Sequence, residues 1–173
     1  MERYVIRGGR EGYDRLLLLA KDRWPDTSAF LQRAGVGAGQ RCVDLGCGSG
    51  EVTIELAQLV SADGSAVGVD TDSVKLDLAR AAALRRGVNN AAFRVMNLNE
   101  WDEPRTYDVV FSRAVLHHLL RPIDLLRRMW AAVRAGGVIA VEDADFEGWC
   151  CHPSNDAFEF FRRAYHQVVE RSG

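Results

Sequence analysis

The chain has 173 residues and a formal net charge of −2, with 47% hydrophobic and 27% charged residues. These values are typical of one globular domain with its own core, and they exclude intrinsic disorder. The apolar runs are far shorter than the roughly 20 residues of a membrane span, and no apolar signal segment follows Met1. We therefore expect a cytoplasmic protein without a membrane partner. The slight acidic excess also argues against a nucleic-acid partner.

The cysteines give no sign of a metal site. They are Cys42, Cys47, Cys150 and Cys151, and without a secretory segment we expect reduced thiols. Cys150-Cys151-His152 lacks the spacing of two to four residues that zinc ligands usually show. Nearly all basic residues are arginine, which hints at a GC-rich bacterial genome.

The first elements in chain order are helical, and a repeating pattern follows them. Residues 10–35 show helical spacing of apolar residues. From there to Glu142, short apolar strands alternate with amphipathic helices. The predicted strands are 41–45, 66–70, 92–96, 108–112 and 138–142. Several are continuous apolar runs, which is typical of parallel strands buried on both faces.

Helices are predicted between these strands and after them. The first covers 50–60, and the second covers 73–86 with Gly87 as its C′ residue. A short helix or turn is expected near 100–105. A helix that begins at Pro122 and ends at Gly136-Gly137 would bury Ile123, Leu126, Trp130 and Val133. The last helix, 155–171, carries the aromatic face of Phe158, Phe161 and Tyr165, extended by Val168.

Repeated β-α-β units predict an α/β fold. We expect a Rossmann-like, doubly wound parallel sheet of about five strands with helices on both faces. The whole chain, 1–173, is predicted to be one domain. It divides into an N-terminal helical segment (1–38), the Rossmann-like core (39–146) and a C-terminal loop and helix (147–173).

A glycine-rich loop at 46–50 is the strongest functional signal, because it follows a strand and opens a helix. A dinucleotide site would have the spacing G-x-G-x-x-G, with a pyrophosphate at the helix N-terminus. Here the spacing is G-x-G-x-G, and Asp44 and Glu51 flank the loop. Two carboxylates would repel a pyrophosphate but suit a cationic cofactor without phosphate, such as S-adenosylmethionine (SAM). No Gly-Lys-Ser/Thr follows, which excludes a P-loop.

Asp70 ends the second strand, where a carboxylate can accept hydrogen bonds from both ribose hydroxyls. NAD sites use the same device, so Asp70 alone does not discriminate between the cofactors.

With these motifs, residues 30–146 resemble class I SAM-dependent methyltransferases, in particular the small-molecule branch similar to the enzymes of ubiquinone and menaquinone biosynthesis. Residues 43–50 match the first motif of the family, and Val69-Asp70 match its acidic strand end. Residues 93–98 look like the motif on the adenine side, with Asn97 where the family usually has Asp. Residues 107–119 look like the motif of the fourth strand, and residues 134–138 resemble the family's Pro-Gly-Gly turn, with Ala135 in place of Pro.

The resemblance implies a contact for each part of SAM or of its product, S-adenosylhomocysteine (SAH). Gly46, the Arg113 carbonyl and Asp44 would hold the methionyl ammonium, and Asp70 would hold the ribose. Thr71, Asn97 and Leu98 would meet the adenine, and the N-terminal segment would close over the cofactor as a lid. The cofactor-binding residues so implied are Asp44, Gly46, Cys47, Gly48, Gly50, Asp70, Thr71, Asn97, Leu98, Arg113, Tyr4 and Arg7.

Methyl transfer from a sulfonium is an in-line displacement that depends largely on positioning, and a general base is needed only for a poorly acidic hydroxyl or a protonated amine. The candidates for such a base are His117, His118, Asp143 and His152. The competing interpretation is that the histidines pack or cap a turn and that Asp143 lies in an exposed loop. The Asn/Asp-Pro-Pro-Tyr motif of nucleic-acid amino methylases is absent, so a small-molecule acceptor is expected.

The family usually has seven strands, with a final β-hairpin after the fifth. Here 31 residues follow Glu142, and we expect them to form one helix and to leave an open sheet edge. An open edge is prone to association, so we predict that the last helix or a partner chain covers it, as in a homodimer. Two further hypotheses stay open: a protein that binds SAM without transfer, as a binding or complementing subunit, and a nicotinamide oxidoreductase.

Overall fold

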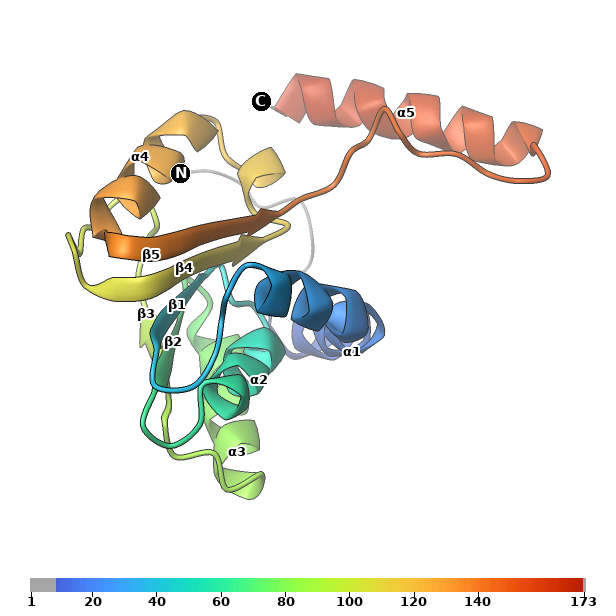
Figure 1. Cartoon of the computed structure of the whole chain (residues 1–173). Helices are drawn as coiled ribbons and strands as arrows, with labels where there is room; N and C mark the ends of the chain where they lie inside the picture. Colours follow the sequence, from blue (N-terminus) through green and yellow to red (C-terminus); the bar gives the residue numbers. More distant parts are fainter. Residues whose placement is uncertain (1–8, 173) are drawn as a thin grey trace.

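The computed structural model describes residues 9–172 (Figure 1). Its elements in chain order are α1 (Gly9–Arg33), β1 (Arg41–Leu45), α2 (Glu51–Leu59), β2 (Ser65–Asp70), α3 (Ser73–Arg85), β3 (Ala91–Val95), β4 (Tyr107–Arg113), the 3-10 turn η1 (Leu116–His118), α4 (Pro122–Ala132), β5 (Val133–Glu142) and α5 (Asp156–Ser172). The predicted contacts of Tyr4 and Arg7 lie outside the described residues.

Within the described chain the strands form one parallel sheet in the order β3-β2-β1-β4-β5. This confirms the predicted Rossmann-like sheet of five strands. The strand order reverses at β1, which pairs with β2 on one side and with β4 on the other. Asp44 lies opposite Gly68 of β2 and Phe111 of β4, so the end of β1 is the topological switch point, where ligands bind in such sheets.

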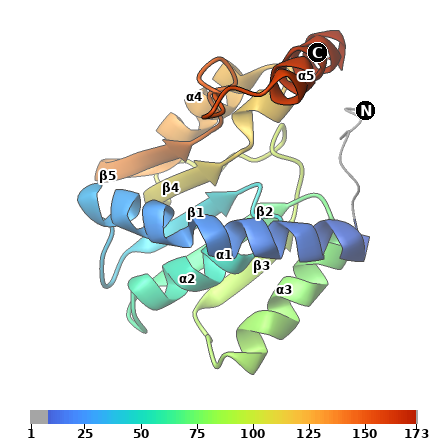
Figure 2. The same ribbon diagram turned by 90° about the vertical axis from the view of Figure 1, so that its right-hand side faces the viewer.

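Successive residues of a strand pack into two different hydrophobic cores, one on each face of the sheet. Phe111 packs with Ile54 of α2 and Leu76 of α3 in the first core. Val110, the preceding residue, packs with Met129 of α4 in the second. α1 lies against α2 and α3, and Figure 2 shows it on the same side of the sheet as these two helices.

The predicted end of the fourth helix is wrong. α4 ends at Ala132, and β5 begins at the next residue, so Gly136 and Gly137 lie inside a strand. The pairing of β4 with β5 shifts register between Tyr107 and Val109. The extra residues of β5 bulge there, and Gly136 adopts a φ of +81° that glycine tolerates without strain.

The predicted apolar stripe of α4 is also displaced. The buried residues are Leu125, Met129 and Ala132, whose i, i+4, i+7 spacing faces the second core. Ile123 and Trp130, expected to be buried, are 56% and 75% exposed.

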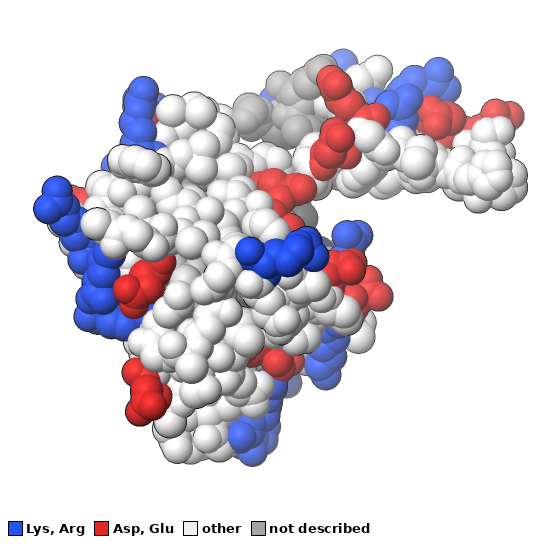
Figure 3. Space-filling view, viewed as in Figure 1, with Lys and Arg blue, Asp and Glu red and all other residues white. Residues whose placement is uncertain are grey.

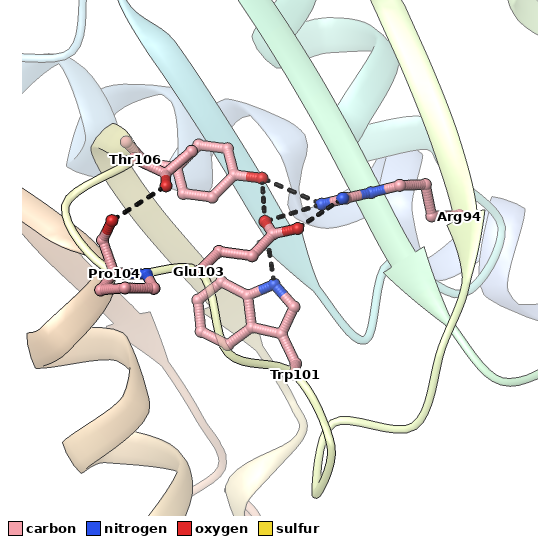
Figure 4. Close-up of polar contacts among 6 residues, drawn as sticks. Arg94, Trp101, Glu103, Pro104 and Thr106 are labelled. Carbon is pink, nitrogen blue, oxygen red and sulfur yellow. Dashed lines mark hydrogen bonds and ion pairs between the residues drawn. The ribbon is translucent and has the colours of Figure 1, made fainter.

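The connection between β3 and β4 contains turns and no helix over the described residues 96–106. A polar cluster on the fully buried Trp101 takes the place of a helix (Figure 4). Arg94 pairs with Glu103 at 2.5 Å and donates to the Tyr107 hydroxyl at 2.9 Å, while the Trp101 indole donates to Glu103 at 3.3 Å. Beside it, a cavity of about 420 Å³ opens near the starts of β1 and β2, away from the glycine loop.

α5 stands off from the sheet as an arm (Figures 1 and 3). Phe160 and Phe161 are 71% and 52% exposed, and none of its described side chains is buried. In both ribbon views α5 lies away from the outer edge of β5, so the prediction that this helix covers the edge is wrong. The physical reason is that residues 143–155 lead away from the strand, and α5 packs its aromatic side chains on that loop.

None of the helices that the structure describes combines the length and the apolar character needed to cross a membrane.

Candidate functional site

The glycine loop lies at the carboxyl end of β1, as predicted. Gly46, Gly48 and Gly50 have φ angles of +74°, +53° and +72°, which side-chain-bearing residues rarely adopt. A Cβ on Gly46 would overlap Val115, and one on Gly50 would lie 2.5 Å from the Cβ of Ala79. Both the backbone conformation and the close neighbours therefore require glycine here.

Hydrogen bonds to the end of β2 fix the loop. The N–H groups of Gly46 and Cys47 donate to the Val69 carbonyl at 2.8 and 3.0 Å, and the Gly48 N–H donates to Asp70 Oδ2 at 2.9 Å. Asp70 Oδ1 accepts from the Asp72 N–H at 3.0 Å. Each carboxylate oxygen of Asp70 keeps acceptor capacity for a ligand hydroxyl.

Cys47 is buried, and its Sγ would lie 2.8 Å from a Cβ placed on Gly68 of β2. Its thiol therefore faces the sheet, and this residue serves the loop through its backbone.

Asp44 is a buried carboxyl beneath the loop. Thr53 of α2 donates to Asp44 Oδ2 at 2.7 Å. Burial raises the pKa of Asp44 to about 6, although the Thr53 hydrogen bond and the Arg113 charge oppose this shift. Asp70 adds a smaller increase. A buried carboxyl of this kind is a candidate partner for the positive charge of a ligand.

The predicted adenine-side residues occupy the turn after β3. Asn97 is exposed, and its Oδ1 accepts from the Asn99 N–H at 3.0 Å, which is the turn role considered as the alternative. Leu98 is buried in the second core. Thr71 is exposed at the end of β2, so its side chain is open to a ligand.

The three predicted catalytic residues lie together. His117 Nδ1 is hydrogen-bonded to Asp143 Oδ1, and Asp143 Oδ2 accepts from the Leu116 N–H at 2.8 Å. Burial opposes ionisation of Asp143, but the bonds from His117 and the Ala144 N–H keep its pKa below the usual range. Burial lowers the pKa of His118 to about 4, and its ring centroid lies 3.9 Å from that of His117.

His152 and Asp145 stay apart from this group. His152 is exposed, and Asp145 Oδ1 accepts from the N–H groups of Glu147 and Gly148 within its own turn. Asp143 and Asp145 both lie in the exposed loop after β5, as the alternative interpretation has it, but Asp143 is in addition hydrogen-bonded to a ring nitrogen of His117.

An aromatic cluster that sequence reasoning did not assemble adjoins the histidines. Phe146 makes an edge contact with His117 at 5.3 Å between centroids and contacts Trp149 at 4.9 Å and Tyr165 at 5.4 Å. Phe161 lies parallel to Trp149 at 6.5 Å. The spacing of Phe161 and Tyr165 on α5 was visible in the sequence, but nothing there linked them to Phe146.

Two threonines of the site also carried no sequence signal. Thr53 bonds Asp44, and the fully buried Thr27 of α1 lies between Arg113 and Glu142. Both depend on tertiary contacts.

Over residues 9–172, no group of three or more His, Cys, Asp or Glu side chains is arranged to hold a metal ion. The four cysteines are free thiols, two buried and two exposed.

A family model described as "Methyltransferase domain" matches residues 37–170. The chain is 33% identical over 120 residues to trans-aconitate 2-methyltransferase of Rhizobium leguminosarum bv. trifolii, covering 69% of this chain and 43% of the relative. It is 34% identical over 110 residues to the ubiquinone biosynthesis O-methyltransferase of Serratia proteamaculans, covering 62% and 44%. The chain thus spans less than half the length of these relatives.

Among solved structures, a SAM-dependent methyltransferase from Aquifex aeolicus superposes with a TM-score of 0.66 at 20% identity, covering 86% of this chain and 79% of that one. This likeness confirms the fold. The predicted resemblance is confirmed by the match over residues 37–170. With its glycine loop and its two carboxylates in place, the chain belongs to the methyltransferase-domain family, the class I enzymes whose cofactor is S-adenosylmethionine.

Proposed function

We propose that this chain binds SAM at the end of β1 and transfers its methyl group to a small-molecule acceptor. The observation that carries the proposal is the pairing of the glycine loop with two carboxylates: Asp44 buried beneath it and Asp70 bonded to it. The chemistry of these donors and acceptors fits SAM. A buried carboxyl suits the ammonium, the strand-end carboxylate suits ribose hydroxyls, and a phosphate would be repelled by both.

Each group of the chain has a distinct task in this proposal. SAM supplies an electrophilic methyl group when bound. Asp44 and the Arg113 carbonyl bind the amino-acid end, Asp70 orients the ribose, and Thr71, Asn97 and Leu98 adjoin the adenine. Close packing of Val115 on Gly46 places the β4–η1 segment, and hence the histidines, next to the glycine loop. Positioning of this kind is the main source of acceleration in an in-line displacement.

His117 is the general base in this proposal. Asp143 holds Nδ1–H of a neutral ring and so leaves Nε2 as the basic nitrogen, an assignment that follows from the hydrogen-bond partner. Nε2 would take the proton of a hydroxyl acceptor as its oxygen bonds to the methyl carbon and the methyl–sulfur bond breaks, with SAH as the leaving group. An ammonium acceptor would lose its proton to Nε2 first, because a protonated nitrogen has no lone pair with which to attack. His118 stays neutral near pH 7, because burial keeps its pKa at about 4.

The acceptor is proposed to be small and partly apolar. The aromatic cluster of Phe146, Trp149, Phe161 and Tyr165 offers ring surface beside the dyad of His117 and Asp143. Figure 3 shows charged side chains of both signs on that face, with a group of basic ones along its left edge. The chain as a whole carries a formal net charge of −2, which favours a small molecule over a nucleic acid as the acceptor.

Two further proposals come from the sequence and need their own tests. Free thiols suit a cytoplasmic location, which cell fractionation would test. A homodimer through α5 or the edge of β5 fits the exposed Phe160 and Phe161. Light scattering after size exclusion should then give twice the chain mass, and a monomer at high concentration would contradict it.

Calorimetry with SAM, SAH and NAD tests the cofactor. We expect binding of SAM and SAH and none of NAD. Absence of SAM binding near millimolar concentration would refute the proposal, and binding of NAD would favour the oxidoreductase hypothesis. Incubation with methyl-labelled SAM and a panel of phenols, carboxylic acids and amines tests transfer. Tight SAM binding without label transfer to any of them would favour a binding or complementing subunit.

A further inference from the structure

The fully buried hydroxyl of Thr27 connects the N-terminal helix to the ends of two strands. Thr27 Oγ1 accepts a hydrogen bond from Arg113 Nη1 at 3.0 Å and donates one to Glu142 Oε2 at 2.7 Å. Arg113 ends β4 and Glu142 ends β5, and the two strands are also joined there by a 2.8 Å bond from the Ala114 N–H to the Glu142 carbonyl. One hydroxyl thus serves a cation and an anion at once.

Arg113 in turn lies next to the glycine loop. Leu45 pairs with Ser112 in the sheet, so Arg113 continues β4 alongside Gly46. The Arg113 guanidinium is close enough to Asp44 to act on its ionisation. Thr27 therefore touches the group whose charge acts on the buried carboxyl.

We infer that Thr27 is a positioning residue of the cofactor site, whose hydroxyl holds the Arg113 guanidinium in place at the end of β4, beside the glycine loop. The inference rests on the proposed function for its consequence in binding, but the effect on Asp44 belongs to the unliganded protein. Helix α1, which is bonded through Thr27 to the ends of β4 and β5, would thereby act on the ionisation of Asp44 in β1.

Several groups act on the pKa of Asp44, and together they limit how far a change at Thr27 can shift it. Thr53 of α2 donates a hydrogen bond, Arg113 attracts, and Asp70 at the end of β2 repels. The neighbouring buried thiols are Cys42 of β1 and Cys47 of the loop, whose pKa values are raised by burial so that both remain neutral between pH 5 and 8. The Thr27 hydroxyl joins Glu142 to Arg113. Without the Arg113 charge, burial and the Asp70 charge would still raise the pKa of Asp44, and only the Thr53 hydrogen bond would lower it.

The first experiment compares Thr27→Val, which keeps the shape and removes the hydroxyl, with Thr27→Ser, which restores it. Ser28→Ala is the matched control, because Ser28 is the adjacent exposed hydroxyl and makes one long 3.4 Å contact. In the unliganded protein, carboxyl ¹³C NMR should show the Asp44 midpoint raised in Thr27→Val and unchanged in Thr27→Ser and Ser28→Ala. An unchanged midpoint in a folded Thr27→Val protein would overturn the inference.

The second experiment measures SAH affinity by calorimetry between pH 5 and 8. Thr27→Val should weaken binding about three- to tenfold near pH 6.5, where the raised midpoint leaves less carboxylate, and less at pH 8. A loss of equal size at every pH, or a lower melting temperature with unchanged affinity, would indicate a merely structural role and contradict the inference.

Arg113→Gln provides the check if Thr27→Val does not fold. It should raise the Asp44 midpoint by itself, and Thr27→Ala, which removes the hydroxyl, should add nothing in that background; an unshifted Asp44 in Arg113→Gln would equally overturn the inference. If the wild-type chain fails to bind SAH, the proposed function falls while the NMR midpoints still decide the role of Thr27.

Discussion

The N–H of Gly48 donates a 2.9 Å hydrogen bond to the Asp70 carboxylate, so the loop after β1 is held by the residue that ends β2. The same carboxylate accepts from the Asp72 N–H, two residues further on. Asp70 therefore shapes the crevice as well as lining it. A carboxylate that is already fixed by two backbone donors binds a ribose without first losing side-chain freedom.

Replacing Asp70 tests this double role. Asp70→Asn keeps one carbonyl oxygen and loses the charge-assisted bonds, so SAH affinity should fall about tenfold to a hundredfold. Calorimetry at pH 7.5 measures the change. Asp63→Asn, at an exposed position of the preceding turn, serves as the control and should bind as the wild type does. Equal affinity of the two variants would remove Asp70 from the site.

The loop glycines provide a matched comparison of conformation and contact. Gly48 and Gly87 have φ angles of +53° and +68°, but a Cβ would meet Leu16 of α1 at 2.9 Å for Gly48 and nothing within 4 Å for Gly87. Each change to alanine should cost about 1 kcal/mol through the backbone alone. Gly48→Ala should also weaken SAH binding, whereas Gly87→Ala should not. Urea unfolding with calorimetry separates the two effects, and unimpaired binding by Gly48→Ala would contradict the assigned site.

If His117 and Asp143 act as the base, a substitution in this pair should lower the rate of methyl transfer without weakening cofactor binding. In Asp143→Asn the amide can no longer fix the same ring tautomer, so kcat should fall by about 10²–10⁴, as for other positioned bases. The affinity for SAH should stay within about twofold, because neither residue is assigned to the cofactor. Asp145→Asn is the control from the same loop, since Asp145 accepts hydrogen bonds from the backbone N–H groups of Glu147 and Gly148 in its own turn.

The assay uses whichever acceptor the panel identifies. A wild-type rate in Asp143→Asn, or equal losses in Asp143→Asn and Asp145→Asn, would mean that the dyad does not act as the base.

The buried His118 predicts a pH dependence of stability. Its pKa of about 4 lies below the ordinary value of 6.5, so between these two pH values the unfolded chain binds a proton that the folded chain does not. The free energy of unfolding should therefore decrease as the pH falls through this window. His118→Gln should flatten that decrease in urea titrations at pH 7, 6 and 5.

His152→Gln, which changes an exposed histidine, should follow the wild-type curve. Asp44 acts in the opposite direction near pH 5, because its raised pKa favours the folded state there. The effect of Asp44 is the same in the wild type, His118→Gln and His152→Gln. If the free energy of unfolding falls equally steeply with pH in His118→Gln and in the wild type, the prediction is contradicted.

The polar cluster of Arg94, Trp101, Glu103 and Tyr107 is expected to stabilise the fold without taking part in cofactor binding. The Arg94 hydrogen bonds hold the pKa of Glu103 below its usual range, so this carboxylate stabilises the fold above its unfolded pKa and loses that effect as the pH falls. Glu103→Gln should lower the free energy of unfolding by about 1–3 kcal/mol at pH 7. SAH affinity should not change, because the cluster lies away from the glycine loop. Glu100→Gln, at an exposed position, should do neither.

The cofactor half of the molecule could be predicted from sequence because its signals are local. A strand, a loop of alternating glycines and a helix follow one another within residues 41–59, and Asp70 ends the next strand. Positive φ angles at Gly46 and Gly48 are demanded by the turn itself. The predicted sheet followed from the same alternation of strands and helices.

The errors arose where tertiary pairing decides. Residues 133–137 fit the end of a helix by their glycines, yet pairing with β4 draws them into β5. The Thr27 hydroxyl bonds Arg113, which lies 86 positions away in the sequence, and Glu142, which lies 115 positions away. No local sequence pattern encodes such distant contacts. Asn97 satisfies its turn with its own side chain, and that role competes with the adenine contact implied by the resemblance.

The placement of α5 bears on how such a chain can change over evolutionary time. Residues 143–172 contribute no strand to the sheet, and the aromatic cluster of Phe146, Trp149, Phe161 and Tyr165 in this segment contacts His117 through Phe146. Under the proposed function, insertions, deletions or exchanges there would alter the surface offered to the acceptor without disturbing the crevice between β1 and β2. The choice of acceptor could then diverge among relatives through changes in this one segment, while the glycine loop and its constraints are inherited intact.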